Sequence, residues 1–413
     1  MNKAFYIKNR EDLVRSINET KAIIVLSSGY SINRSADEDY EFQVNNNFYY
    51  LTGINQDEVH LIIIKDNDSY IEQLYISEYD EMYEKWIGHR LTIKEASRIS
   101  GIFPANISYL DEFEDDIKLL KDYKVMYLDL EEKGNINYNS FALTLKEKAK
   151  KAFNIKNVYE NIVRLRMVKK PCEIKAFKKA IDITNDGILA LMKNAKPNIY
   201  EYQLEAFFDY TIKDEGNNPV SFKTIAASGI NATTLHYSSN NSLINDNDLI
   251  LFDLGCKYDN YCADISRTFP INGKFSKLQK TIYEIVLKAN KQICKIAKAN
   301  MTIRQLQEIC IDILATGCLN ASLIKDKKEI SKYYFHSVSH SIGLDTHDPF
   351  IKDTPLPVNA VISNEPGLYF KEYGIGIRIE DDLLIKENHA INLSSKIIKE
   401  IKDIEKFMER NKD

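Results

Sequence analysis

Short apolar runs alternate with helical patterns in the first part of the chain, to about residue 155. Apolar residues over four to eight positions predict strands, and apolar residues three or four apart predict helices. By these patterns we expect strands at Ala22–Leu26, Leu61–Ile64, Tyr70–Ile76 and Val125–Leu130, and helices at Glu11–Asn18 and Ser140–Ala152. Residues 1–157 are therefore predicted to form an α/β domain, whose work is assembly or shaping access to a site.

A second domain is predicted at residues 158–413, with Val158–Lys170 as the connection. Pro171 suits the first position of a helix, and apolar residues follow it at helical spacing. From there the same order of two helices and two strands occurs twice. The first set is Pro171–Lys193, Tyr200–Lys213, Leu249–Leu254 and Tyr261–Phe269, and the second is Lys277–Lys298, Ile303–Thr316, Ala360–Ser363 and Gly376–Ile385. The repeat predicts a duplicated α+β architecture with a cleft between its halves.

Composition agrees with two folded domains. The 413 residues exceed the usual size of one hydrophobic core, and 44% hydrophobic with 28% charged residues is far from the composition of disordered chains. The formal charge of −5 comes without a basic stripe, so nucleic acid and anionic membranes are not expected partners. The first ten residues lack an apolar signal stretch and no later run could span a membrane, so we expect a cytoplasmic protein.

The six cysteines all follow residue 170 and show no C-x2-C pair of a zinc or redox site. We expect reduced and mostly buried thiols at these positions. They are Cys172, Cys256, Cys262, Cys294, Cys310 and Cys318.

Two aspartates fall within a predicted β-hairpin. If its turn centres on Tyr258 and Asp259, antiparallel pairing places Asp253 opposite Asp264, about 5 Å apart. Like charges and desolvation both oppose ionisation of such a pair, and a cation between the two carboxylates removes that penalty. The alternative is that one aspartate points to solvent or caps a turn.

Two further acidic positions lie in the second half. Glu365 follows an apolar run, and Glu380 lies in an apolar strand. By alternation Arg378, Glu380 and Asp382 share one face, so a simple ion pair of Arg378 with either acid is the alternative to a ligand role.

Histidines cluster in the same region. The chain has only seven, and His336, His340 and His347 fall within twelve positions, with His236 upstream. A lone histidine is more often structural, but this density predicts a ligand plus groups that handle protons.

Four carboxylates and one imidazole suit two divalent ions with bridging carboxylates. Structural zinc would want thiolates or more imidazoles, and calcium would gather its oxygens from one loop. Two such ions can form a bridging hydroxide near neutral pH and polarise a carbonyl, which favours hydrolysis of an acyl bond. A dinucleotide loop, a Walker A element and a nucleophile elbow are not indicated by this sequence.

These residues resemble the pita-bread metallopeptidases, the family of methionine aminopeptidase, prolidase and aminopeptidase P. The matching segments are Asp253–Gly255, Tyr261–Phe269, His336–Asp348, Asn364–Tyr369 and Gly376–Asp381. Three segments of the first domain look like the amino-terminal domain of aminopeptidase P, which methionine aminopeptidases lack. They are Tyr40–Gln43, Asn47–Gly53 and Trp86–Arg90.

The resemblance implies a metal-dependent Xaa-Pro aminopeptidase that cleaves peptides with proline in second position, through a hydroxide that bridges two Mn²⁺ ions. It implies that Asp264 and Glu380 bridge the metals, and that Glu365 also handles a proton. The full implied ligand set is Asp253, Asp264, His340, Glu365 and Glu380.

The resemblance also implies roles on the substrate side of the pocket. His236 and His347 would bind the substrate carbonyl, while His336 and Arg378 would line the proline side. Trp86 would reach the active site of a neighbouring subunit in a homodimer or homotetramer.

Three other functions stay open. Prolidase, which cuts only dipeptides, shares all five ligands, and a non-catalytic binding protein or a metal-independent creatinase-like enzyme could use the same fold. Departures from the family pattern at Ser337, Ser341, Asn364 and His89 bear on pocket dimensions and not on the ligands.

Overall fold

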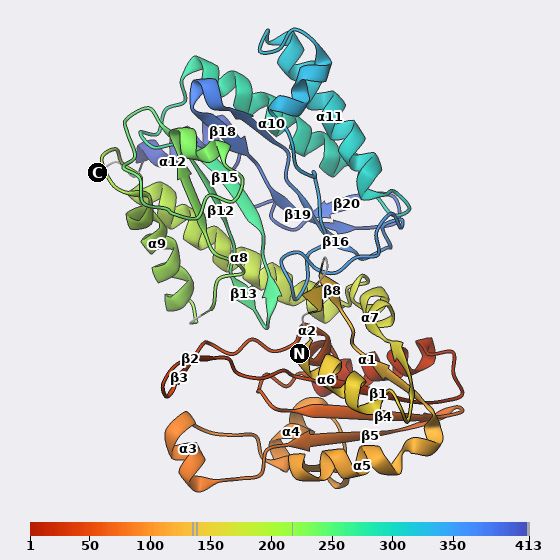
Figure 1. Ribbon diagram of the computed structural model, residues 1–413. Helices are drawn as coiled ribbons and strands as arrows, with labels where there is room; N and C mark the ends of the chain where they lie inside the picture. Colours follow the sequence, from red (N-terminus) through yellow and green to blue (C-terminus); the bar gives the residue numbers. More distant parts are fainter. Residues whose placement is uncertain (134–135, 138, 217, 411–413) are drawn as a thin grey trace. The chain divides into compact units, whose positions relative to one another are not determined.

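The computed structural model describes residues 1–133, 136–137, 139–216 and 218–410. Two compact units divide the chain, Met1–Arg166 and Met167–Asp413, each drawn in Figure 1 with its own layers. None of the helices within those described ranges combines the length and apolar content that a membrane crossing needs. The cytoplasmic location and the roles of the two domains stay predictions.

The first unit contains a six-stranded sheet of order β10-β7-β1-β4-β5-β6. Its strands are β1 (Lys21–Ser27), β4 (His60–Asp66), β5 (Ser69–Ile76), β6 (Ile107–Tyr109), β7 (Val125–Leu128) and β10 (Asn154–Asn157). β4 pairs antiparallel with β1 and β5, whereas β7 runs parallel to β1 and β10. The four predicted strands are confirmed. The sequence missed β6 and β10 because neither contains a recognisable apolar run.

Helices surround this sheet, and α5 and α6 cover one of its faces. The helices are α1 (Lys3–Ser16), α2 (Asn46–Thr52), α3 (Glu81–Ile87), α4 (Ile93–Ser100), α5 (Phe113–Leu119), α6 (Ser140–Ala149) and α7 (Tyr159–Arg166). Short 3-10 helices are η1 (Pro104–Asn106), η2 (Leu110–Glu112) and η3 (Lys121–Tyr123), and small ribbons pair β2 (Asn33–Ser35) with β3 (Glu38–Asp39) and β8 (Glu132–Lys133) with β9 (Ile136–Asn137). The segment expected to be a connection contains helix α7. Its residues Ile162 and Val163 are buried, and packing of these apolar side chains stabilises the helix.

The first helix begins earlier than predicted. Polar residues interrupt the apolar pattern of its first part, so the pattern indicated only the second part. The Asn2 side chain caps the helix by accepting the Phe5 N–H, so the helix starts well before Glu11. Asn9 and Arg10 are buried and donate to the carbonyls of Tyr50 and Leu51. In the sequence, a buried polar residue that has a hydrogen-bond partner cannot be told from a polar residue on the surface.

The second unit carries five α-helices and ten strands in the described part of the chain. The helices are α8 (Pro171–Asn194), α9 (Glu201–Asp214), α10 (Lys277–Ile296), α11 (Ile303–Asn320) and α12 (Ile401–Arg410), with 3-10 helices η4 (Gly229–Thr233), η5 (Lys327–Lys332) and η6 (Lys371–Tyr373). The strands are β11 (Ile225–Ser228), β12 (Leu249–Leu254), β13 (Lys257–Tyr258), β14 (Tyr261–Cys262), β15 (Ile265–Pro270), β16 (Val361–Asn364), β17 (Gly367–Phe370), β18 (Ile375–Arg378), β19 (Asp381–Ile385) and β20 (Ala390–Asn392).

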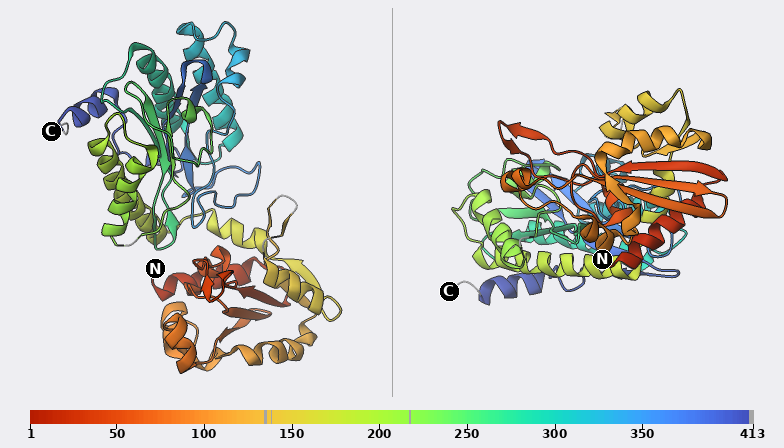
Figure 2. Two further views of the ribbon diagram at one scale, coloured as in Figure 1. Left: turned by 60° about the vertical axis from the view of Figure 1, so that its left-hand side comes forward. Right: turned by 90° about the horizontal axis from the view of Figure 1, so that it is seen from below.

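The predicted duplication is confirmed in this order of elements. Sheet β11-β12-β15 belongs to the first half, and sheets β16-β19-β20 and β17-β18 belong to the second. Helix α8 packs with α9, and α10 packs with α11, on the outside of the strands (Figures 1 and 2). One continuous core of buried apolar side chains joins both halves.

The predicted hairpin register was wrong by two residues. Asp259 and Asn260 have φ angles of 49° and 65°, so the turn centres on them rather than on Tyr258 and Asp259. Aspartate and asparagine tolerate this left-handed conformation, which a two-residue hairpin turn requires. Asp253 consequently pairs with Ser266, and Asp264 lies between β14 and β15.

The predicted strand Gly376–Ile385 is two strands, β18 and β19, which pair with different neighbours. Between them the Glu380 N–H donates to the carbonyl of Ser266 at 3.1 Å. The Arg267 guanidinium returns a hydrogen bond to the Glu380 carbonyl at 2.5 Å. At this break, Glu380 of the second half is therefore hydrogen-bonded to β15 of the first half.

All six cysteines are free, four of them buried and two partly buried. The prediction of mostly buried thiols is therefore confirmed, and their reduced state stays a prediction.

Candidate metal centre

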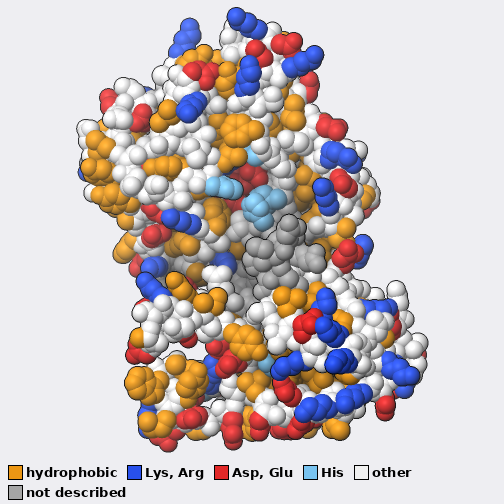
Figure 3. Space-filling view, in the orientation of Figure 1, with side chains coloured by type: hydrophobic (Ala, Val, Ile, Leu, Met, Phe, Trp, Pro, Cys, Tyr) orange, Lys and Arg blue, Asp and Glu red, His pale blue; other side chains and the backbone are white. Residues whose placement is uncertain are grey.

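One pocket of about 660 Å³ in the second unit contains every side chain predicted for the site. These are Asp253, Asp264, His340, Glu365, Glu380, His236, His336, His347 and Arg378. The first two lie on or beside β12 and β15, and the others except His236 come from the second half. In the space-filling view, pale-blue histidines border red acidic side chains in a hollow of this unit (Figure 3). The fold thus gathers groups that lie more than a hundred positions apart.

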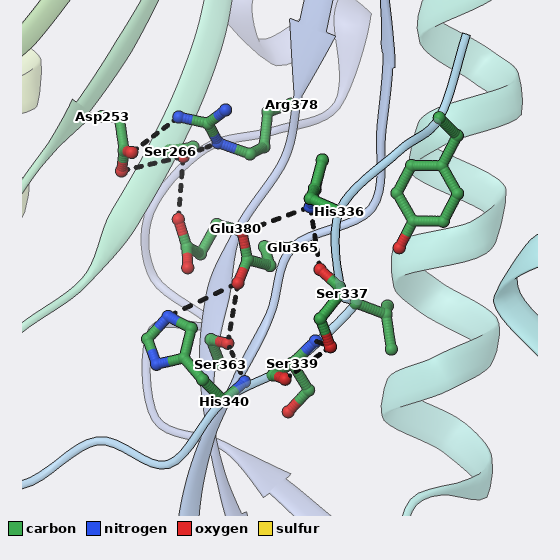
Figure 4. Close-up of polar contacts among 12 residues, drawn as sticks. Asp253, Ser266, His336, Ser337, Ser339, His340, Ser363, Glu365, Arg378 and Glu380 are labelled. Atoms are coloured by element: carbon green, nitrogen blue, oxygen red, sulfur yellow. Dashed lines mark hydrogen bonds and ion pairs between the residues drawn. The ribbon is translucent and has the colours of Figure 1, made fainter. Parts of the chain in front are cut away.

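His340 lies between the carboxylates of Asp264 and Glu365. Its Nε2 is 3.3 Å from Asp264 Oδ2 and 3.4 Å from Glu365 Oε1. Figure 4 shows the contact with Glu365. Its Nδ1 is 3.0 Å from the Ser341 carbonyl, which can only accept, so Nδ1 carries a proton. In the neutral ring Nε2 is then the nitrogen with the free lone pair, and it points at the carboxylates.

Ser266 joins the other two carboxylates. Its Oγ is 3.0 Å from Asp253 Oδ1 and 2.8 Å from Glu380 Oε2. Arg378 donates to the same Oγ through Nε at 2.7 Å and to Asp253 Oδ2 through Nη2 at 2.6 Å. The ion pair of Arg378 is therefore made with Asp253 and not with Glu380 or Asp382, the pairings the sequence offered as alternatives.

The electrostatics of the pocket reflect buried like charges. Burial, together with neighbouring carboxylates, raises the pKa of Asp264 to about 6, that of Glu365 to about 7 and that of Glu380 well above its ordinary value. Burial would lower the pKa of His340, but the contact with Asp264 and the charge of Glu365 outweigh it and raise that pKa to about 9. The cluster holds more acid than the protein's own cations neutralise.

The donor set fits divalent cations. Ligand atoms of Asp264, His340 and Glu380 all lie within 4.8 Å of one another. Glu380 Oε1 is buried and has no hydrogen-bond partner among the described residues, which is costly unless another positive group meets it. Carboxylate oxygens with one imidazole are the donors that hard to borderline divalent ions take. Asp253 and Glu365 stand beside these three and complete an oxygen-rich site.

Three further histidines face the pocket. The His347 ring stacks on the His340 ring at 4.1 Å between centroids. His336 places Nε2 2.9 Å from the Tyr369 hydroxyl. Burial lowers the pKa of both His336 and His347 to about 4, so both are neutral near pH 7. His236 lines the same pocket, is exposed, and makes no hydrogen bond or ion pair within the part of the chain that the structure describes.

Sequence reasoning missed several residues that hold the site in place. Tyr369 receives a hydrogen bond from Arg378 Nη1 at 3.0 Å, and Ser363 Oγ accepts from the His340 N–H at 2.9 Å. Asp382 Oδ2 accepts from the Asp264 N–H at 3.3 Å. Each lies one to five residues from a predicted ligand, yet only the fold shows which ones turn inward.

Comparisons with known proteins agree with this geometry. The pattern of metallopeptidase family M24 matches residues 175–387, and that of the aminopeptidase P N-terminal domain matches residues 6–127. An Xaa-Pro aminopeptidase from Haemophilus influenzae is 31% identical over 94% of each chain. The chain belongs to metallopeptidase family M24. The chain is therefore a metallo-exopeptidase, and the convergence of acids and histidines is its candidate metal centre.

Structures of M24 members extend the likeness to the whole chain. A Bacillus anthracis protein described as a candidate aminopeptidase P superposes with a TM-score of 0.96 at 43% identity, covering 100% of this chain and 99% of that one. Escherichia coli aminopeptidase P, solved with the inhibitor Pro-Leu, gives a TM-score of 0.92 at 29% identity with the same coverage. The predicted fold, an aminopeptidase P-like α/β domain followed by a pita-bread domain, is confirmed. The individual roles of the site residues stay predictions.

Proposed function

We propose that this M24 member is a metal-dependent Xaa-Pro aminopeptidase, which hydrolyses the bond between the first residue of a peptide and a proline in second position. The observation that carries the proposal is the convergence of four carboxylates and His340 in one pocket. Support comes from relatives named Xaa-Pro aminopeptidase along nearly the whole chain. Its substrates would be peptides with an N-terminal residue before proline.

The proposed ligands are Asp253, Asp264, His340, Glu365 and Glu380, with Asp264 and Glu380 shared between two divalent ions. When bound, these ions would supply an activated water-derived nucleophile near neutral pH and polarise the scissile carbonyl. We propose Mn²⁺ as the usual occupant, because the donors are mostly oxygens. Arg378 and Ser266 orient Asp253 and Glu380 by the hydrogen bonds described above.

The remaining groups would handle protons and substrate. Glu365 would take a proton from the attacking water and pass it toward the proline nitrogen that leaves. His236 and His347 would donate to the substrate carbonyl as its oxygen gains negative charge. His336 is held by Tyr369 and would line the proline side together with Arg378.

Replacing one shared carboxylate tests the proposal. Asp264→Asn is expected to abolish hydrolysis of an Xaa-Pro-Xaa tripeptide, because a neutral amide cannot balance two cations. Asp186→Asn, on the exposed side of α8, is the matched control and is expected to keep full activity. Direct metal analysis of the active protein is expected to find close to two ions per chain. Full activity after metal removal would contradict the proposal.

Prolidase is the second candidate, because it shares the five ligands. Assays of an Xaa-Pro dipeptide and an Xaa-Pro-Xaa tripeptide with added Mn²⁺ separate the two activities. We expect turnover of the tripeptide, and turnover confined to the dipeptide would favour prolidase. Failure of both substrates in the metal-loaded protein would favour a non-catalytic binding protein instead.

We also propose that the chain forms a homodimer or homotetramer in which Trp86 reaches a neighbouring active site. Trp86 is 75% exposed and Met82, one turn before it on α3, is 62% exposed, which is unusual for large apolar side chains. Sedimentation of the native protein as a monomer would contradict this part of the proposal.

A further inference from the structure

Lys223 is a cation of the active-site pocket that the site described above leaves unused. It lines the same pocket as the proposed metal ligands, together with Arg378. Arg378 is engaged by Asp253, Tyr369 and Ser266. Lys223 makes no ion pair or hydrogen bond within the part of the chain that the structure describes, and it is exposed. Its ammonium group is therefore available to a ligand that enters the pocket.

The backbone that carries Lys223 is firmly held. Asn240 donates through Nδ2 to the Thr224 carbonyl at 2.8 Å and accepts the Ala226 N–H through Oδ1 at 3.1 Å. Asn240 is itself buried, so these bonds are shielded from water. The lysine thus projects from a well-held segment just before β11, and its four-carbon stem is the flexible part.

The strand register gives the distance of that point from the proposed metal ligands. Ile225 is the direct partner of Asp253 in the β11–β12 pair, and Lys223 lies two residues before it. Two residues of extended chain span about 7 Å. Ile225, two positions after Lys223, lines the pocket as well.

A bound substrate would span a similar length. In an Xaa-Pro-Xaa tripeptide the scissile carbonyl belongs to the first residue, so proline and the third residue carry the terminal carboxylate about 7 Å outward. The proposed ligand carboxylates would repel that group, because they are of the same charge. A cation at the distance of Lys223 offsets this repulsion.

One acid faces Lys223 from helix α9. Glu205 lies near enough for the charge of Lys223 to lower its pKa, although burial dominates and leaves that pKa raised. The Glu205 carboxylate accepts a hydrogen bond from Asn240 Nδ2 at 2.9 Å, so it is already engaged. A substrate carboxylate would compete with Glu205 for Lys223 by approaching it directly.

We infer that Lys223 binds the free C-terminal carboxylate of short peptides and gives the enzyme a preference for Xaa-Pro-Xaa tripeptides that end in a free acid. This inference rests on the proposed function. It adds a specificity-determining residue and a substrate class, short peptides with an unmodified C-terminus, to the same pocket.

The test compares one Xaa-Pro-Xaa tripeptide as the free acid and as the C-terminal amide, with the Mn²⁺-loaded enzyme. For the unaltered protein, kcat/KM is expected to be about threefold to tenfold higher for the acid than for the amide, mainly because KM is lower for the acid. This is the size of effect that one partly exposed ion pair gives. Lys223→Met is expected to remove the preference by raising KM for the acid alone. Lys223→Arg is expected to keep it, and added salt to weaken it.

Lys213→Met, on the exposed end of α9 and outside the pocket lining, is the control and should leave the preference unchanged. Equal metal content in all variants shows that their sites are formed. Equal cleavage of acid and amide by the unaltered protein, or a preference that survives Lys223→Met, would overturn the inference while the proposed function stands. Cleavage of neither peptide by the metal-loaded protein would instead overturn the proposed function.

Discussion

Single side chains decide how the acidic pocket is organised. Ser266 has no charge, yet its hydroxyl contacts Asp253, Glu380 and Arg378 at the same time. It accepts from the Arg378 Nε and donates its one proton to a carboxylate, so it spaces two acids that would otherwise repel each other. Hydrogen bonds of this kind to a ligand orient it toward a metal.

Ser266→Ala is expected to lower the affinity for Mn²⁺ by about tenfold to a hundredfold, because Asp253 and Glu380 lose their common partner. A titration of tripeptide hydrolysis against free Mn²⁺ measures the change. Ser331→Ala, at an exposed serine of η5, should leave the titration unaltered. An unchanged Mn²⁺ midpoint in Ser266→Ala would contradict this role.

His60 makes the first unit sensitive to acid. It is buried among Phe113, Phe141 and Tyr30, and burial lowers its pKa from 6.5 to about 4. The unfolded chain therefore binds more protons than the folded one between these two values, so stability falls as pH drops from 6.5 toward 4. The loss amounts to about 3 kcal/mol when complete.

His60→Phe is expected to flatten the pH dependence of urea unfolding of the first unit between pH 6.5 and 4. His89→Asn is the control at an exposed histidine whose pKa is raised instead by Glu95 and Glu84, and it should retain the loss of stability on acidification. An acid sensitivity that persists undiminished in His60→Phe would contradict the prediction.

At the scale of elements, apolar runs and the repeated order of elements predicted many of the strands and helices correctly, whereas the strand register was predicted wrongly. The apolar runs of β1, β4 and β12 stand out because central strands are buried along most of their length. The register of the hairpin depends on which two residues adopt positive φ, and Tyr258 to Asn260 offer more than one choice. For the same reason the partner of Asp253 could not be read from spacing alone.

The side chains that meet in the pocket were predictable where chemistry requires particular residue types. Asp253, Asp264, Glu365 and Glu380 stand out as acids in or beside apolar segments, and the choice of His340 among three clustered histidines rested on the family resemblance. Supporting residues such as Ser266, Ser363 and Lys223 do not, because serine and lysine are common and only tertiary contacts turn them toward the pocket.

Helix α10 ties together the strand ends that carry two proposed ligands. Asn290, fully buried on this helix, donates through Nδ2 to the carbonyls of Asn364 at 3.2 Å and Ile379 at 3.1 Å. These residues directly precede Glu365 and Glu380. Asn364 Nδ2 donates in return to the Asn290 carbonyl at 2.8 Å, which explains the polar residue that departs from the family pattern there.

Asn290→Ala is expected to destabilise the second unit by about 2 to 4 kcal/mol, since two buried carbonyls lose a donor. It should also weaken Mn²⁺ binding, because the segments before Glu365 and Glu380 lose their common support. Gln292→Ala, on the exposed side of the same helix, should change the free energy of unfolding by less than about 0.5 kcal/mol. Urea unfolding and isothermal titration with Mn²⁺ measure both effects, and an Asn290→Ala protein as stable as Gln292→Ala would contradict the prediction.

For the whole molecule, the two units are expected to respond differently to metal. Every proposed ligand belongs to the second unit, so a bound ion stabilises that unit by its binding free energy. Hydrogen exchange should slow on addition of Mn²⁺ in β12, β15, β16 and β19, and stay unchanged in β1, β4 and β5. Equal protection of the sheet of the first unit would contradict this assignment.

The most direct test of the central claim is anomalous X-ray diffraction from crystals of the Mn²⁺-loaded protein at the manganese absorption edge. The account predicts two adjacent peaks in the pocket, both in contact with Asp264 and Glu380, and with Asp253, His340 and Glu365 completing their coordination. A single peak, or peaks that leave any of these five side chains out of contact, would contradict it.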